Sequence, residues 1–299
     1  MKGASYRNKK HVTPFSVIMF AILFCYAALL CFLLFWVLMS SFKSKADFNF
    51  HPLNWPEKFI FSNYKNVLEQ LYVPLTIPGV GTKRLYLLQL FGNSLIYAVG
   101  ATVISILTHA MVAYVVAKYR FFLRNAIYTV AVLVMIIPIV NSLPSELAIM
   151  RKIGFYDNIL GLILMKGSFT GINFLILHAT FSGISWEYAE AARMDGASNA
   201  KIMFRIMFPM ASTTMTILAL TSFIGFWNDW TSTMVYMPSY PTAAYALYNF
   251  QNSNINIIAT GGVPYVLCAC GIVMLPILAV FILFRNRLMG EFAVGGIKG

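Results

Sequence analysis

Two glutamates and a methionine share one face of a short helix that we expect in the middle of the chain. Glu187 and Glu190 lie three residues apart, and Met194 follows four residues later. Side chains at these spacings are neighbours on a helix surface. Asp195-Gly196 ends this helix, and a second short helix is expected from Ala197 to Phe208. The result is a helix-turn-helix elbow whose mixed acidic and apolar surface suits the binding of a partner protein.

The elbow, residues 185–208, also carries a motif with long spacing. Gly196 follows Glu190-Ala191-Ala192 by four positions, Ile206 follows Gly196 by ten, and Pro209 comes three residues later. This pattern resembles the EAA loop in membrane subunits of bacterial ABC importers, although Phe208 stands where that family usually has Leu. The Asp195-Gly196-Ala197-Ser198 version is most similar to carbohydrate importers of the maltose-permease G type. The resemblance implies docking on a cytosolic ATPase through Glu187, Glu190, Ala191, Ala192, Asp195, Gly196 and Ala197.

Two ionisable residues lie within long apolar segments, where a charge is costly and therefore often functional. Lys166 could face an outer vestibule or extend to the membrane interface. Asp229 follows Trp227-Asn228, a pair that by resemblance recurs in the fifth span of carbohydrate permeases. Three roles fit Asp229: it could contact the sugar, form part of a gate or serve the packing of helices. The expected substrate pathway or gate comprises Lys166, Asn173, Trp227, Asn228 and Asp229.

The sequence contains no recognisable catalytic, nucleotide or metal site. The stretch from Gly79 to Lys83 has the wrong spacing for a phosphate-binding loop. We expect His109 and His178 to make hydrogen-bonded packing contacts between helices rather than to form a proton relay. Cys268-x-Cys270 has no histidine or carboxylate nearby to complete a metal site. We therefore expect no enzymatic activity, metal or cofactor in this chain, with ATP and Mg²⁺ bound by a partner ATPase.

The composition predicts a membrane protein. Of 299 residues, 59% are hydrophobic and only 11% are charged, which is too apolar for an ordinary soluble domain. The formal net charge of +12 would suit nucleic acid. However, the basic residues are dispersed and the aromatic residues lie in apolar runs, so we expect a lipid bilayer and no nucleic acid. The first apolar run is too long for a cleavable signal peptide, so the first span is expected to remain.

Six segments are long and apolar enough to cross a membrane, which needs about 20 residues. They are expected at residues 14–40, 88–117, 125–143, 158–184, 210–237 and 263–284. Lys166 and three glycines interrupt the fourth segment, and Pro276 predicts a kink in the sixth. The predicted fold class is all-α, a polytopic membrane protein with six transmembrane helices.

The basic residues predict the orientation in a bacterial cytoplasmic (inner) membrane. With the N-terminus inside, thirteen Lys and Arg residues lie in cytoplasmic segments and eight lie outside. Both termini and the elbow are then cytoplasmic. The expected divisions are an N-terminal tail at 1–13, a permease domain at 14–290 and a C-terminal tail at 291–299. The domain includes an outer segment at 43–87, read as an irregular cap with a helix near residues 63–71, and an outer loop at 238–262.

The resemblance covers almost the full length and implies the core of a type I ABC importer permease. Its implied partners are a second, nonidentical permease subunit, two ATPase subunits and an extracellular solute-binding protein. The C-terminal residues resemble a family tail that runs along the interface between the two ATPases: Gly295, Gly296, Ile297, Lys298 and Gly299.

Other functions remain open at the level of sequence. The same permease architecture could serve a solute that is not a sugar. A proton-coupled secondary transporter could use His109, Lys166, His178 or Asp229, but it would leave the elbow motif unexplained. A membrane-anchored receptor or structural subunit would have no transport pathway at all.

Overall fold

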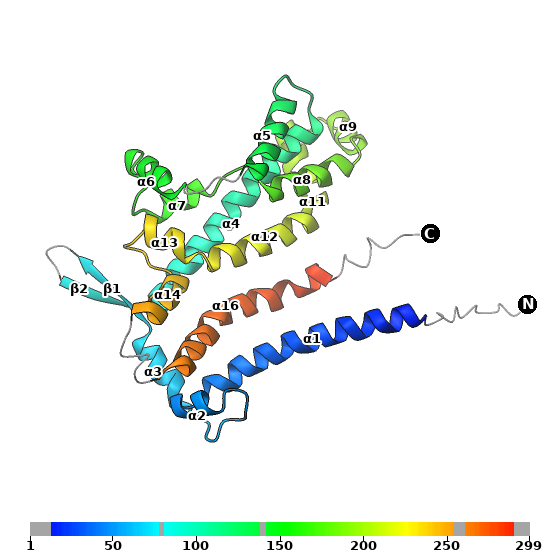
Figure 1. The fold of residues 1–299 in the computed structure, drawn as a ribbon. Helices are drawn as coiled ribbons and strands as arrows, with labels where there is room; N and C mark the ends of the chain where they lie inside the picture. The colour runs from blue at the N-terminus through cyan, green and yellow to red at the C-terminus, as the bar shows by residue number, and fades with distance from the viewer. Residues whose placement is uncertain (1–12, 78–80, 138–141, 254–260, 290–299) are drawn as a thin grey trace, which may run out of the picture. The chain divides into compact units, whose positions relative to one another are not determined.

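The computed structural model describes residues 13–77, 81–137, 142–253 and 261–289. The chain divides into two compact units. The first comprises residues 1–67 and 255–271, and the second comprises residues 68–254 and 272–299. Helices dominate both units, as Figure 1 shows, and the described strands form one two-stranded sheet.

The first unit begins with a long apolar helix, α1 (Pro14–Ser41). Thr13 caps it, because its hydroxyl accepts a hydrogen bond from the Ser16 N–H at 3.3 Å. Apolar side chains occur on every side of α1, and most are exposed within this single chain. A helix that is hydrophobic all round belongs in a membrane or a protein interior. The length and mean hydropathy of 2.9 make α1 a candidate membrane span.

Two short helices, α2 (Lys45–Phe50) and α3 (Ser62–Gln70), follow α1. The Asn63 amide donates to the carbonyls of Ser41 and Lys43, both at 2.9 Å, and so fixes the start of α3 against the end of α1. Helix α3 confirms the short helix expected near residues 63–71. The first unit also contains the start of α16 (Val263–Met289), which continues into the second unit.

The second unit begins after Val67 and contains an antiparallel hairpin of β1 (Tyr72–Ile77) and β2 (Gly81–Tyr86). The register pairs Tyr72 with Tyr86. The predicted irregular cap was wrong for residues 72–77 and 81–86, which form a regular hairpin. Pro74 and the adjacent Lys83 and Arg84 obscure the alternation of a strand in the sequence. A two-stranded sheet consists of edge strands, which tolerate proline.

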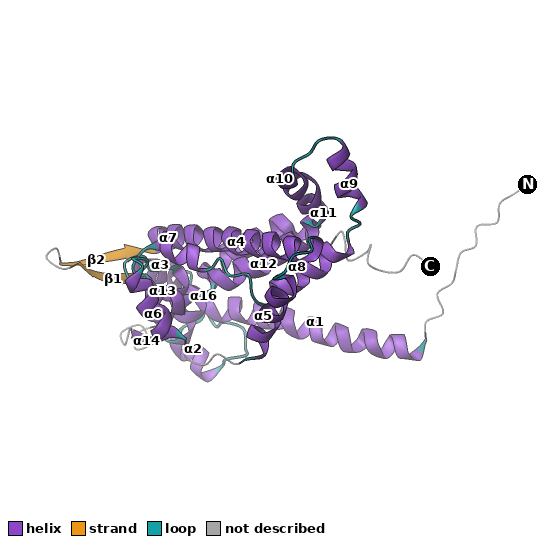
Figure 2. Ribbon diagram, turned by 90° about the horizontal axis from the view of Figure 1, so that it is seen from above, coloured by secondary structure: helices purple, strands orange, loops and turns teal. Residues whose placement is uncertain are grey.

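Three helices form the packed centre of the second unit: α4 (Leu87–Lys118), α8 (Ile172–Gly183) and α12 (Ser212–Trp227). Helix α4 is the longest element of the chain and contacts the other two (Figures 1 and 2). It buries alanines at spacings of three residues, for example Ala98 with Ala101 and Ala110 with Ala113. Small residues let helices approach closely in a membrane.

Outside the elbow, the second unit has five more helices in the described ranges. They are α5 (Arg124–Ile136), α6 (Leu143–Lys152), α7 (Ile159–Met165), α13 (Trp230–Tyr236) and α14 (Ala243–Ser253).

Two of the expected spans are broken in the structure. The fourth is divided into α7 and α8, since the chain leaves the helix at Lys166 and Gly171 takes a positive φ of 100° before α8. The fifth ends at Trp227, and a bend at Asn228-Asp229 separates it from α13. The expected third span begins as α5, and part of its end lies outside the described residues.

Three helices in the described ranges are long and apolar enough to cross a membrane: α1, α4 and residues 263–284 of α16. A fourth candidate is the bent pair of residues 199–210 and 212–227, whose axes differ by 77°. The chain is therefore a mostly helical protein with three or four candidate spans, and the full set of six stays a prediction.

Candidate functional site: coupling elbow and polar cluster

The elbow folds as two helical arms joined by a glycine turn. Its first arm is α9 (Glu187–Met194), and its second arm runs through α10 (Asn199–Ile202), the π-helical turn η1 (Met203–Met207) and α11 (Phe208–Met210). The predicted helix-turn-helix is thus confirmed. Gly196 has a φ of +77°, a left-handed conformation that glycine adopts at little cost.

The π-helical turn has a cause in the sequence. Pro209 has no backbone N–H, so the carbonyl of Arg205 cannot receive the usual α-helical bond from that residue. The Phe208 N–H instead reaches back to the carbonyl of Met203, five residues earlier. The turn widens at this point and allows the second arm to meet α12 at the bend.

The inner side of the elbow packs against the central helices. Ala189 and Ala192 of α9 are buried, as are Ile202 and Met207 of the second arm. They belong to one hydrophobic cluster with buried residues of α4 and α8, such as Phe181. The elbow therefore lies on the packed core, and a movement of α9 would be transmitted to both helices.

Further contacts attach the elbow to the end of α4. The Trp186 ring, just before α9, packs edge-on against Tyr119 at 5.7 Å between centroids. Tyr119 packs against Tyr114 of α4 in the same way, also at 5.7 Å. The Lys118 ammonium donates to the carbonyl of Ile184, which joins the ends of α4 and α8 beside the elbow.

The outer side of α9 is not covered by any other described part of the chain. Glu187, Glu190 and Ala191 are exposed, and Met194 is 89% exposed. Asp195 and Gly196 are exposed at the turn, and Ala197 is half-buried. Ala192 differs from the other predicted coupling residues because it faces the core, where it supports α9 from within.

Lys166 and Asp229, 63 residues apart in the sequence, form an ion pair. The Lys166 Nζ lies 3.4 Å from Asp229 Oδ2 and donates to the Ser232 hydroxyl at 3.0 Å. The Tyr97 hydroxyl of α4 donates to the same carboxylate oxygen at 2.8 Å. We call Tyr97, Lys166, Asp229 and Ser232 the polar cluster. Tyr97 and Ser232 were not among the predicted site residues. Only the fold brings Tyr97 to Asp229, whereas Ser232 lies three residues after Asp229 and could have been found from Asp229 as the cap of α13.

The polar cluster holds the break between α12 and α13. Asp229 Oδ1 accepts the Ser232 N–H at 2.9 Å, so the same side chain caps α13. The side chains of Lys166 and Asp229 are 24% and 20% exposed. Both oxygens of the carboxylate are therefore engaged, and the pair is partly shielded from solvent.

The other predicted pathway residues serve different contacts. The Trp227 ring is buried against Phe91 and Phe223, and its indole N–H donates to the carbonyl of Val273 at 3.2 Å. Asn228 is exposed, and its amide bonds to its own helix. The Asn173 amide donates to the Ser222 hydroxyl at 3.2 Å between α8 and α12. Only Lys166 and Asp229 of the predicted set are in direct polar contact with each other.

The histidines of α4 and α8 have packing contacts. His109 on α4 lies 2.6 Å from the carbonyl of Ser105 and 3.0 Å from that of Thr170, which precedes α8. His178 packs against the rings of Tyr128 and Phe174, with the nearer centroid at 4.9 Å. Neither histidine contacts the polar cluster through a hydrogen bond in the described part of the chain.

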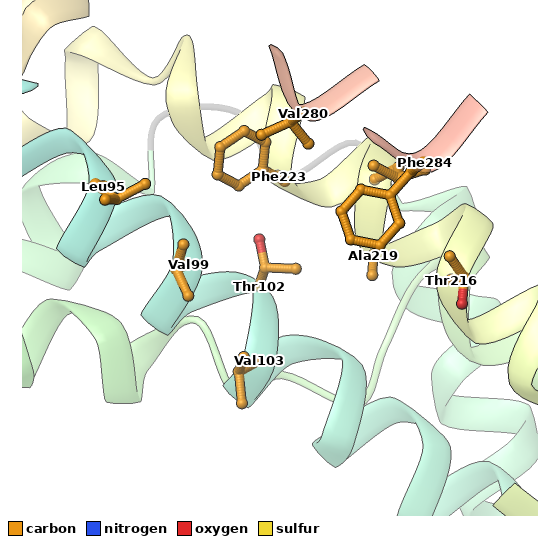
Figure 3. A pocket seen from close by; sticks show the side chains of 10 residues that line it. Leu95, Val99, Thr102, Val103, Thr216, Ala219, Phe223, Val280 and Phe284 are labelled. Atoms are coloured by element: carbon orange, nitrogen blue, oxygen red, sulfur yellow. The ribbon is translucent and has the colours of Figure 1, made fainter. Parts of the chain in front are cut away.

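An apolar groove of about 290 Å³ lies between α4, α12 and α16 in the second unit (Figure 3). Its polar lining groups are the hydroxyls of Thr102 and Thr216, and it has no charged lining residue. None of the predicted pathway residues lines this groove. The predicted tail residues Gly295, Gly296, Ile297, Lys298 and Gly299 lie outside the described residues, as does part of the outer loop at 238–262.

Long apolar helices together with an exposed elbow are typical of an integral membrane component of a larger assembly. A family described as "Binding-protein-dependent transport system inner membrane component" matches residues 107–289. The match covers more than half of the chain, including the elbow and the polar-cluster residues Lys166, Asp229 and Ser232. The chain belongs to this family, and it is a permease subunit of an ABC importer in the inner membrane.

Curated relatives extend over most of the chain. The diacetylchitobiose uptake system permease protein NgcG of Streptomyces coelicolor is 28% identical over 292 residues, covering 95% of this chain and 89% of that protein. The trehalose transport system permease protein SugB of Mycobacterium tuberculosis is 27% identical, covering 83% of this chain and 92% of that protein.

A solved structure shares the fold. It belongs to a bacterial ABC transporter involved in the import of the acidic polysaccharide alginate. The TM-score is 0.71 at 21% identity, and the match covers 96% of this chain and 99% of that one. At this level of identity the likeness concerns the fold alone.

Proposed function

We propose that this chain is one of two nonidentical permease subunits of an ATP-driven importer for a carbohydrate, with oligosaccharides as the first candidates. The names of NgcG and SugB, which refer to diacetylchitobiose and trehalose, support a sugar substrate. The complete importer contains a second permease subunit, two ATPase subunits and an extracellular solute-binding protein. ATP and Mg²⁺ bind to the ATPase subunits, and this chain contributes transport rather than catalysis.

The membrane domain, residues 14–290, crosses the bilayer six times in this proposal. The helix pair α7–α8 and the pair α12–α13 each act as one interrupted crossing. Such breaks are tolerated where protein or a cavity satisfies the free backbone groups. Both tails, 1–13 and 291–299, lie in the cytoplasm, and residues 43–87 and 238–262 lie outside.

The single observation that carries the coupling function is the two-sided elbow. Its inner side, with Ala189 and Ala192, is packed on α4 and α8, and its outer side presents Glu187, Glu190 and Met194. The outer side docks on the ATPase through residues 187, 190–192 and 195–197, with Ala192 acting from the core side. When the ATPases close, the elbow moves as a rigid lever and turns the helix bundle, which alternates access to the two membrane faces.

The polar cluster acts as a gate or helix clamp rather than as a direct sugar site. Asp229 already accepts hydrogen bonds from Tyr97 and Ser232 as well as the ion pair with Lys166. A sugar hydroxyl would have to displace one of these donors. Asn228 and Asn173 remain candidates for the pathway wall, and the C-terminal residues 295–299 contact the ATPase interface.

The proposed function predicts ATP-dependent sugar uptake by the reconstituted importer. The complete complex would be placed in proteoliposomes with the binding protein and tested with labelled diacetylchitobiose and trehalose. Glu190→Lys should reduce uptake at least tenfold and weaken copurification of the ATPase, because it reverses the charge of the docking face. Glu69→Lys is the matched control, since Glu69 is also exposed but lies on α3, away from the elbow. Uptake driven by a proton gradient without ATP would contradict the proposal.

A further inference from the structure

Four basic side chains are exposed at the end of the second unit that lies away from the elbow. Lys83 and Arg84 lie on β2, and Arg151 and Lys152 lie in the last turn of α6. All four are exposed. We call these four residues the outer basic surface.

The hairpin and α6 share one end of the unit. Strand β1 packs on α14, α14 packs on α13, and α13 packs on α6. Both views show these elements together near the start of α4, while α9 lies near its other end (Figures 1 and 2). The four cations therefore lie at one end of the unit, away from the coupling elbow.

Two of these cations are held in place by aromatic rings, and none of the four is neutralised by a described carboxylate. In the described part of the chain, none of the four lies within ion-pair distance of a carboxylate. The Arg84 guanidinium instead lies over the Tyr72 ring at 4.7 Å, and that of Arg151 lies over Tyr156 at 4.9 Å. An aromatic ring supports an arginine while leaving its N–H donors and its charge available.

Two carboxylates at the same end are directed to other groups. Glu146 accepts the Tyr236 hydroxyl at 2.8 Å, and hydrogen bonds from Ser142 and Tyr236 lower its pKa. Asp157 accepts the N–H of Ser239 at 2.8 Å and its hydroxyl at 2.7 Å. Both carboxylates are half-buried. Glu69, three residues before β1, is exposed, so the exposed charge at this end consists of the four cations and one carboxylate and is mainly positive.

Basic residues on the outer side of a membrane protein run against the usual preference for the cytoplasmic side. The negative end of the helix dipole favours cations in the last turn of a helix, and this partly explains Arg151 and Lys152. It does not account for Lys83 and Arg84, which lie on a strand. A negatively charged partner would explain both pairs.

We propose that the outer basic surface docks an acidic patch on the extracellular solute-binding protein. This inference rests on the proposed function, because it requires the binding protein as partner and the outside location of the hairpin. Exposed charges at the rim of an interface chiefly accelerate encounter and select orientation. The surface should therefore control the concentration of binding protein that is needed for half-maximal ATP hydrolysis, rather than the maximal rate of hydrolysis.

The test uses the complete transporter in vesicles of neutral phosphatidylcholine, with the sugar-loaded solute-binding protein from the same gene cluster as the probe. ATP hydrolysis is measured against binding-protein concentration at several salt concentrations. The double variants Lys83→Glu/Arg84→Glu and Arg151→Glu/Lys152→Glu should each raise the half-maximal concentration about tenfold at low salt, with the maximal rate retained. Added salt should raise the half-maximal concentration of binding protein for the unchanged transporter and lower this concentration for the variants.

Arg84→Lys/Arg151→Lys is the matched control: it loses the arginine contacts with the Tyr72 and Tyr156 rings but keeps both charges, so the half-maximal concentration should stay within about threefold. Unchanged binding-protein dependence in both charge-reversed variants would overturn the inference. The inference would also be overturned if the variants altered ATP hydrolysis only in vesicles with anionic phosphatidylglycerol, since the surface would then contact lipid. If the unchanged transporter shows no stimulation by the binding protein at all, the proposed function fails, and this inference fails with it.

Discussion

Gly196 is the residue on which the shape of the elbow depends. Its φ of +77° places it in the left-handed region, and a Cβ built on it would meet nothing within 4 Å. Substitution at this position is therefore opposed by the backbone conformation and not by crowding. The sequence predicts this turn, because Asp-Gly follows a helical run and the motif requires glycine at the same place.

Replacing Gly196 should separate the backbone effect from the loss of a contact. Gly196→Val should lower ATP-dependent uptake several-fold, because a β-branched residue pays about 1–2 kcal/mol in the left-handed conformation. Gly196→Asn should retain most of the uptake, since asparagine tolerates that conformation. Uptake is measured beside the membrane level of each variant. Equal loss in both variants would indicate that a side chain at 196 obstructs the ATPase instead.

The ion pair of Lys166 and Asp229 could not be predicted from the sequence. Each residue attracts attention as a charge in an apolar segment, but 63 positions separate them and nothing in the local pattern pairs them. Their contact requires the chain to break after α7 and again after α12, so that Lys166 meets Asp229, which also accepts the Tyr97 hydroxyl of α4. The apolar pattern predicts the segments, whereas tertiary packing decides where they break.

Neutralising one member of this pair should destabilise the protein more than neutralising both. Lys166→Met or Asp229→Asn alone leaves a shielded charge without its partner, and each should cost about 1–3 kcal/mol. The double variant Lys166→Met/Asp229→Asn should recover part of that loss. The apparent unfolding temperature of the purified complex in detergent measures this. Additive losses in the double variant would show that the ion pair contributes nothing.

At the scale of elements, the elbow arms and α3 were predicted close to their observed positions, but the hairpin was not. The elbow has strong local signals: good helix formers, a glycine stop and a proline at the end. The hairpin has weak ones, since Pro74 interrupts β1 and Lys83-Arg84 make β2 look like a solvated loop. A strand pair of this kind is defined by its partner, and a local pattern does not reveal it.

The junction of α4, α8 and the elbow offers an element-scale test. Lys118→Met removes the hydrogen bond to the Ile184 carbonyl and should leave the ends of α4 and α8 free to shift. We expect the amount of ATP hydrolysed per sugar transported to rise about two- to fivefold, because loss of this hydrogen bond removes about 1–3 kcal/mol of stabilisation at the junction. Lys118→Arg keeps a donor and should behave like the unchanged protein. A normal ratio of ATP to sugar in Lys118→Met would show that the junction is not part of the coupling.

At the scale of the second unit, α4 connects the two proposed working faces. Its 32 residues correspond to about 48 Å at 1.5 Å per residue. This length exceeds the hydrocarbon core of a bilayer, about 30 Å, and slightly exceeds the thickness of about 40–45 Å that includes the headgroups. The hairpin precedes its first turn, and Lys118 in its last turn bonds beside the elbow. A helix of this length that crosses the membrane places the hairpin and the elbow on opposite sides.

Cysteine labelling decides which side is which. Asn63 is unsuitable as an outer reporter because it is buried and bonds to Ser41 and Lys43, whereas Thr82 is exposed on the hairpin. Ala200 is exposed on the elbow and leaves the Ser198 cap of α10 intact. After replacement of the four native cysteines, Thr82→Cys should react with an impermeant maleimide in intact protoplasts or spheroplasts. Ala200→Cys should react only after the membrane is permeabilised, and the reverse pattern would invert the orientation predicted from the basic residues.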